Sequence, residues 1–297
     1  MPQNFADGPL TPRDPDPIEL PSVAVLGAGA IGKSLLKGLT RPSVTVRGAI
    51  RATCSSASRA RELLSEFPQV AVASVEEDLD GNRKAVQDAE LVVLAVSPDL
   101  VPAVAAAISD SLKPGALVVS VAAGVTLGAL QEMLPASGTV IRVLPNMGGD
   151  VGFGVTGLGS NERSTEQQLE ATADLFRTIG TVVTVRDDQL DAVSSLSGSG
   201  PGYFYFFVEQ LTASGMELGF SHEQARVLAE QTFLGSAALM HSSGRPPAEL
   251  LGYFTAPDGT SIRALKQLAD AGFKETLLKA ASASMARARD IAAETGQ

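Results

Sequence analysis

The sequence is poor in the residues on which several large classes of protein depend. It has one cysteine, two histidines and no tryptophan in 297 residues, so it can build neither a disulfide framework nor a cysteine-rich metal site, and we expect no metal. Acidic residues outnumber basic ones, 33 to 23, for a net charge of −10. That balance argues against nucleic-acid binding. No apolar run reaches the ~20 residues that span a bilayer, so no membrane association is expected.

The N-terminal segment differs in composition from the rest of the chain. Residues 1–20 are rich in proline and aspartate and contain no apolar core. This is not the composition of a signal peptide, and it predicts a disordered tail in a cytoplasmic protein. The length that remains suggests two domains, which we place at residues 21–186 and 187–297.

Apolar runs and helical patterns alternate through the first of these domains. Strands are predicted at 23–26, 44–53, 91–96, 117–121, 139–143, 154–159 and 181–185, with helices at 33–39, 59–67, 100–109, 127–133 and 164–179. This rhythm predicts an α/β fold, a Rossmann-like doubly wound sheet that binds its ligand at the carboxyl ends of the strands.

No strand is evident beyond 187, and helices are predicted at 201–218, 222–241, 262–268 and 274–293. The first of these contains the aromatic run Tyr203 to Phe207. About 110 residues of helix make a small core. We therefore expect an all-helical domain that completes its core against a second subunit, as a dimer.

A glycine-rich turn follows the first strand. It consists of Gly27, Ala28, Gly29, Ala30, Ile31 and Gly32. In the pattern Gly-x-Gly-x-x-Gly, the first glycine permits a tight turn, the second lets a pyrophosphate approach and the third lets the helix pack against the strand. The position between a strand and a helix predicts a dinucleotide site, although an ordinary turn between a strand and a helix is the alternative.

The second strand indicates which dinucleotide is bound. An NAD site usually has Asp or Glu at the end of this strand, but no acidic residue occurs from Pro21 to Arg61. Ser55, Ser56 and Arg59 are present instead, and hydroxyls, a helix N-terminus and a guanidinium group suit a 2′-phosphate. NADP(H) is therefore favoured, unless Arg59 is only a solvated helix charge.

A second glycine-rich stretch, Leu196-Ser-Gly-Ser-Gly-Pro-Gly-Tyr203, precedes the aromatic helix. Glycine tolerates unusual backbone angles and proline favours the first turn of a helix. We expect a tight loop that leads into a helix and faces a ligand, with a simple interdomain linker as the alternative.

These segments together resemble the pyrroline-5-carboxylate reductase family over nearly the whole chain after the tail. The resemblance also rests on three further segments: Ala95-Val96-Ser97-Pro98, Arg142 to Asn146, and Ala256 to Ser261. It implies hydride transfer from NAD(P)H to the cyclic imine of 1-pyrroline-5-carboxylate, which gives L-proline. It also implies interlocked dimers, often associated into decamers.

The resemblance assigns further site residues. Ala95, Val96, Ser97, Pro98 and Asn146 are expected beside the cofactor. Asn146 either orders the loop near the nicotinamide or is an ordinary turn residue. The backbone of Asp258, Gly259, Thr260 and Ser261 would hold the substrate carboxylate, and the Ser261 hydroxyl would contact the ring nitrogen as the catalytic group.

Three departures from the family pattern leave alternatives open. Ser97 stands where the family has lysine, Gly148 where it has proline, and Asp258 where it has glycine. Asp258 either repels a substrate carboxylate or caps the following helix. A reductase of another cyclic imine or ketone is thus one alternative, and a non-catalytic NADP(H)-binding regulatory protein is another.

The two histidines are expected to be structural or solvated, which disfavours a histidine-dependent hydroxy-acid dehydrogenase.

Overall fold

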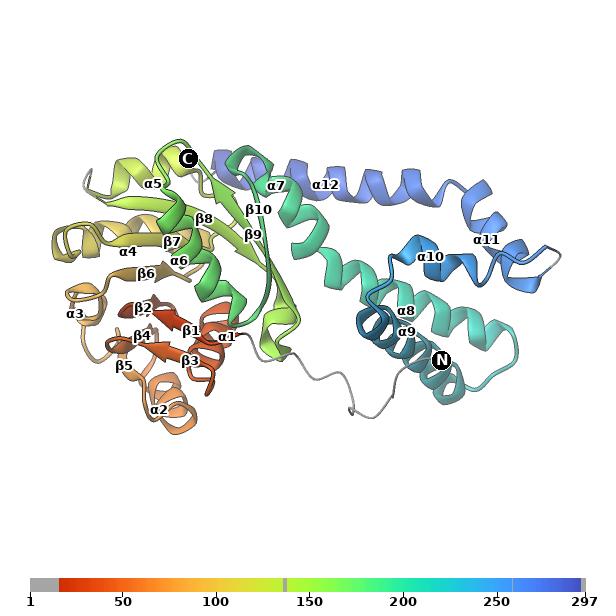
Figure 1. Cartoon of the computed structure of the whole chain (residues 1–297), viewed down its shortest axis with the longest axis horizontal. Coiled ribbons are helices and arrows are strands. Elements are labelled where there is room, and N and C mark those ends of the chain that lie inside the picture. The colour runs from red at the N-terminus through yellow and green to blue at the C-terminus, as the bar shows by residue number, and fades with distance from the viewer. Residues whose placement is uncertain (1–15, 136–137, 258, 295–297) are drawn as a thin grey trace. The chain divides into compact units, whose positions relative to one another are not determined.

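The computed structural model describes residues 16–135, 138–257 and 259–294. These residues form two compact units, one made of residues 199–284 and one of residues 16–198 with 285–294. Figure 1 shows the elements of both. The structure keeps residues 187–198 with the sheet, whereas the predicted domain boundary lies at 186/187, and that boundary stays a proposal.

The first unit is built on a parallel sheet of eight strands in the order β10-β9-β8-β7-β6-β2-β4-β5, in which only β8 and β9 pair antiparallel. Its strands are β2 (Val23–Leu26), β4 (Ile50–Cys54), β5 (Ala71–Ser74), β6 (Leu91–Leu94), β7 (Leu117–Ser120), β8 (Thr139–Pro145), β9 (Gly154–Ser160) and β10 (Gly180–Arg186). Its helices are α1 (Ala30–Leu39), α2 (Ala57–Glu66), α3 (Gly81–Val86), α4 (Val101–Ile108), α5 (Leu127–Met133), α6 (Glu166–Arg177) and α7 (Leu190–Val193).

Alternate residues of the central strands enter two different cores. Val23 and Val25 of β2 pack with α1, α2 and α6, whereas Ala24 and Leu26 pack with α3, α4 and α5. A strand buried on both faces reads as a continuous apolar run, which is why β2, β6 and β7 could be predicted. The doubly wound sheet is confirmed.

Two predictions near the N-terminus are wrong. Ile18–Leu20, assigned to the disordered tail, form strand β1. Ile18 and Leu20 are buried while Glu19 is exposed, and β1 pairs in parallel with β3 (Val44–Val46). The single strand predicted over 44–53 is therefore two, because β3 belongs to this small sheet and β4 to the large one. Residues 1–15 of the predicted tail lie outside the described residues.

The second unit is helical, and no strand occurs among its described residues. It contains α8 (Gly200–Glu217), α9 (His222–Ser243), α10 (Pro247–Gly252), α11 (Thr260–Asp270) and most of α12 (Phe273–Glu294). A capping box starts α9, where Ser221 Oγ accepts from the Gln224 N–H and Gln224 Oε1 accepts from the Ser221 N–H. This unit lacks a core of its own, since the only buried residues described in it are Thr212, Ala225 and Ala229.

Over the part of the chain that the structure describes, no helix is long and apolar enough to cross a membrane. Within the same residues, no cluster of three or more His, Cys, Asp or Glu side chains could hold a metal ion.

Candidate functional site: a dinucleotide site at the carboxyl edge of the sheet

The turn from β2 to α1 gives each of its three glycines a different environment. Gly27 has φ +96°, in the left-handed region that favours glycine. A methyl group on Gly32 would lie 2.2 Å from the Gly27 carbonyl oxygen, so α1 packs directly on the turn. A methyl group on Gly29 would meet no described atom within 4 Å. The open side of the turn is thus at Gly29, where α1 begins without a side-chain cap.

A second loop lies against this turn. The Ala95 N–H donates to the Leu26 carbonyl at 2.8 Å, and a methyl group on Gly27 would be 2.7 Å from the Ala95 carbonyl oxygen. Ser97 is exposed and begins the short 3₁₀ helix η1 (Pro98–Leu100). The structure therefore brings the predicted segments 27–32 and 95–98 together at one edge of the sheet.

The predicted 2′-phosphate residues lie where β4 ends and α2 begins. Ser56 is the N-cap of α2, and its hydroxyl accepts from the Arg59 N–H at 3.3 Å. The Arg59 guanidinium donates to the Ala28 carbonyl at 3.4 Å and forms a 2.8 Å ion pair with Glu62. Arg59 thus reaches the glycine turn, and its hydrogen bond and positive charge hold the pKa of the Glu62 carboxyl below its usual range. Ser55 is exposed beside it.

The same place holds an acidic residue that the sequence reasoning missed. Glu76, after β5, accepts a hydrogen bond from the Ala57 N–H at 2.8 Å. The acid-free segment ends at Arg61, but the acidic run that starts at Glu76 follows the neighbouring strand β5. The carboxyl ends of neighbouring parallel strands share one edge of the sheet, and this rule could have found it.

Asn146 connects the end of β8 to a distant segment. Its Oδ1 accepts from the Gly148 and Val155 N–H groups at 3.2 and 3.1 Å, and its Nδ2 donates to the Ser197 carbonyl at 3.2 Å. The amide therefore orders the loop, which agrees with both expectations for Asn146. Contact with a cofactor stays a prediction.

The stretch that contains Ser197 is not the irregular loop that was predicted. Ser194–Gly198 form a π-helical turn that continues α7, and α8 starts at Gly200. The Ser195 and Ser197 hydroxyls donate to the carbonyls of Ala192 and Val193 at 2.9 and 3.1 Å. The two serine side chains thus add hydrogen bonds from this turn to the helix that precedes it.

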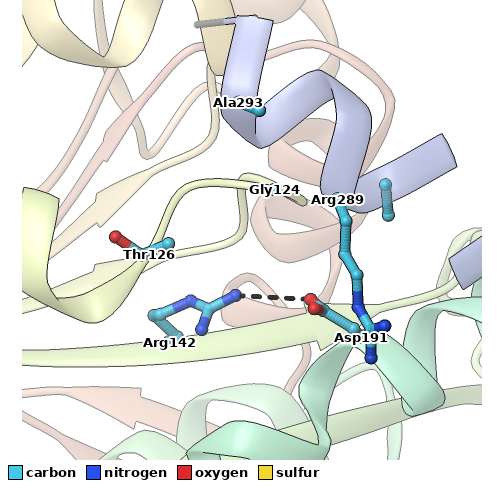
Figure 2. A pocket seen from close by; sticks show the side chains of 7 residues that line it. Gly124, Thr126, Arg142, Asp191, Arg289 and Ala293 are labelled. Carbon is cyan, nitrogen blue, oxygen red and sulfur yellow. Dashed lines mark ion pairs between the residues drawn. The ribbon is translucent and has the colours of Figure 1, made fainter. Parts of the chain in front are cut away.

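Two of the residues that line a pocket of about 240 Å³, Arg142 and Asp191, form an ion pair. Arg142, on β8, forms ion pairs with Asp187 at 3.0 Å and Asp191 at 3.9 Å. Figure 2 shows Arg142 and Asp191 pointing toward each other in this pocket, near Arg289 of α12. Because the two aspartates largely neutralise Arg142, we assign the cluster a structural role, joining β8 to α7.

The predicted substrate segment lies in the helical unit. Gly259 is the N-cap of α11, and Thr260 and Ser261 are the first residues of the helix. Among the described residues, no side chain caps this helix and its first turn contains no acidic residue, an arrangement that suits an anion. Asp258 lies outside the described residues.

The two histidines lie at the ends of α9, and the single cysteine is the last residue of β4. His222 is exposed in the first turn of α9, and His241 is in its last turn. Cys54 is buried, its Sγ–H donates to the Ser56 carbonyl, and burial raises the pKa of the thiol. A protonated, buried thiol packs rather than attacks.

The sheet, the open glycine turn and the helix N-termini around it define a dinucleotide-binding oxidoreductase fold. Comparison with known families agrees. Residues 22–124 match the family "NADP oxidoreductase coenzyme F420-dependent", and residues 187–291 match the family "pyrroline-5-carboxylate reductase dimerisation".

Individual proteins give the same result over the full length. The pyrroline-5-carboxylate reductase of Pseudomonas aeruginosa is 36% identical over 278 residues, which cover 93% of this chain and 99% of that protein. The solved pyrroline-5-carboxylate reductase of Coxiella burnetii has a TM-score of 0.80 at 29% identity, covering 90% of this chain and 97% of that one. The Plasmodium falciparum pyrroline carboxylate reductase, solved with NADP bound, shares the fold, with a TM-score of 0.73 at 24% identity and coverage of 91% and 98%. The chain belongs to the pyrroline-5-carboxylate reductase family.

Proposed function

We propose that this protein reduces 1-pyrroline-5-carboxylate to L-proline with NADPH. Family membership supports the reaction, and the observation that carries the cofactor is the glycine turn. Of the three glycines in this turn, Gly29 faces open space, whereas Gly27 and Gly32 are closed in by neighbouring backbone. That is the arrangement a pyrophosphate requires.

The residues around the turn fit the proposed cofactor. Backbone N–H groups at the start of α1 would bind the pyrophosphate. Ser55, Ser56 and Arg59 would bind the 2′-phosphate, which is supported by the position of Arg59 against Ala28. When bound, NADPH supplies the hydride for the imine carbon. Residues Ala95 to Pro98 and the loop ordered by Asn146 would border the nicotinamide and exclude water from it.

The substrate would be held by the start of α11. Backbone N–H groups of residues 258–261 would bind its carboxylate, supported by the absence of acidic residues from the described first turn of this helix. The Ser261 hydroxyl would hydrogen-bond the ring nitrogen and so orient the imine. Little else is required of the protein, because orientation supplies much of the reduction in the barrier.

Turnover of 1-pyrroline-5-carboxylate with NADPH, followed by the loss of NADPH absorbance and by detection of proline, tests this function. Ser261→Ala should lower kcat/KM by about ten- to a hundredfold through lost orientation, while Ser261→Thr should keep most of it. Ser236→Ala, an exposed serine on α9, is the control and should be neutral. A wild-type protein that produces no proline with NADPH or NADH would refute the proposal.

The match to a dimerisation family and the poorly buried helical unit support self-association. We infer a homodimer as the working form, and its further association into decamers is also a proposal. A cytoplasmic location is the matching proposal, since both reactants are small water-soluble molecules.

A further inference from the structure

The N-terminus of α2 is occupied by a carboxylate from a neighbouring loop. The Ala57 N–H, the first of the helix, donates to Glu76 Oε2 at 2.8 Å. The Ser74 hydroxyl accepts from the Glu76 N–H at 3.2 Å and so holds the loop in place. Because β4 and β5 pair in parallel with Cys54 opposite Ser74, the sheet register itself sets Glu76 beside α2.

This carboxylate provides the negative charge that α2 itself lacks. The helix has no acidic residue in its first turn, and Arg59 adds a positive charge there. A helix N-terminus favours an anion by electrostatics and by its open N–H groups. Glu76 therefore gives this end of α2 a negative charge and a hydrogen-bond acceptor, as a bound phosphate would.

The 2′-phosphate of NADPH would need the same position. Its proposed ligands, Ser55, Ser56 and Arg59, surround the N–H group that Glu76 occupies. A phosphate monoester carries roughly −1.5 to −2 charges at pH 7, so the carboxylate and the phosphate repel each other and compete for one donor. NADH raises no such conflict, because a carboxylate at this position can accept a hydrogen bond from the ribose 2′-hydroxyl.

We propose that Glu76 is a specificity-determining residue that lowers the preference of this protein for NADPH over NADH. Its carboxylate accepts a hydrogen bond from the Ala57 N–H at the position that the 2′-phosphate would need. With NADPH it must leave the Ala57 N–H, and with NADH it can stay. This inference rests on the proposed function, since it assumes that the adenosine end of a dinucleotide binds here.

Binding of two adenosine probes tests this without turnover. Adenosine 2′,5′-bisphosphate and adenosine 5′-phosphate differ only in the 2′-phosphate, and calorimetry gives a Kd for each. Glu76→Gln should tighten the bisphosphate about tenfold and change the monophosphate less than twofold. The gain should shrink at high salt, which screens exposed charges. Glu77→Gln is the control, because it removes the same charge from the same loop and should change either Kd less than twofold.

Three results would overturn the inference: no gain in Glu76→Gln, an equal gain for both probes, or an equal gain in Glu77→Gln. If the wild type binds neither probe, the proposed cofactor site fails and the inference with it. If the wild type binds both probes and makes proline, but Glu76→Gln changes neither Kd, only the inference fails. Thermal unfolding checks that Glu76→Gln, at an exposed position, leaves the fold intact. If Glu76→Gln does not fold, Glu76→Ser provides a second variant.

Discussion

Two glycines of one turn should respond to the same substitution in opposite ways. Gly32→Ala places a methyl group 2.2 Å from the Gly27 carbonyl oxygen, inside the closest contact that atoms tolerate. The obstacle is backbone, so it cannot rotate away as a side chain would. Gly29→Ala places its methyl group in open space, and the φ of −74° at Gly29 suits any residue.

The magnitudes follow from this geometry. Overpacking costs roughly 1–3 kcal/mol and sometimes more, and we expect about 3 kcal/mol for Gly32→Ala because backbone must move. At about 2–4 °C per kcal/mol for a large domain, its Tm should fall by about 6–12 °C. Gly29→Ala should leave Tm within about 2 °C but weaken NADP⁺ binding by about ten- to a hundredfold, since it blocks hydrogen bonds to a charged group worth ~1.5–3 kcal/mol each.

Thermal unfolding and calorimetric titration with NADP⁺ measure the two effects separately. Gly128→Ala is the control, because Gly128 on α5 also has no described atom near its added methyl group, and it should change neither quantity. Wild-type NADP⁺ affinity in Gly29→Ala would refute the pyrophosphate site. Wild-type stability in Gly32→Ala would refute the packing argument.

Two further predictions concern stability and assembly. Arg142→Met should lower the unfolding free energy by about 3 kcal/mol, because it leaves the half-buried carboxylates of Asp187 and Asp191 without their cation. Urea unfolding measures this loss, and adding Asp187→Leu should recover much of it. An Arg142→Met protein within about 1 kcal/mol of wild type would contradict the prediction. Light scattering at micromolar concentration should give at least the mass of a dimer, because many large apolar side chains of residues 199–284 are exposed in the single chain; a well-folded monomer would contradict it.

Much of the first unit could be predicted from local sequence because its elements are set by local rules. The strands β2, β6 and β7 are buried on both faces and so appear as unbroken apolar runs. Gly27 to Gly32 follow one such run, and the chemistry of each glycine depends on the backbone within that turn. The capping box of α9 is equally local, since its two hydrogen bonds join Ser221 and Gln224.

The errors arise where a partner distant in sequence determines the conformation. β1 has only three residues and is stabilised by β3, which lies more than twenty positions later in the sequence. The π-helical turn is linked to Asn146 through the Ser197 carbonyl. Glu76 is far from Arg59 in the sequence and comes beside α2 only through the pairing of β4 with β5.

The position of Glu76 bears directly on the preference for NADPH over NADH. The acid-free stretch from Pro21 to Arg61 removes the residue that usually binds the ribose of NAD, and taken alone it favours NADPH strongly. The structure returns a carboxylate to the same place from the next strand. In the proposed site, Arg59 would favour the 2′-phosphate and Glu76 would oppose it, so the preference would be a difference between two opposed charges at one helix end. We therefore expect single substitutions of these two residues to shift the preference in opposite directions.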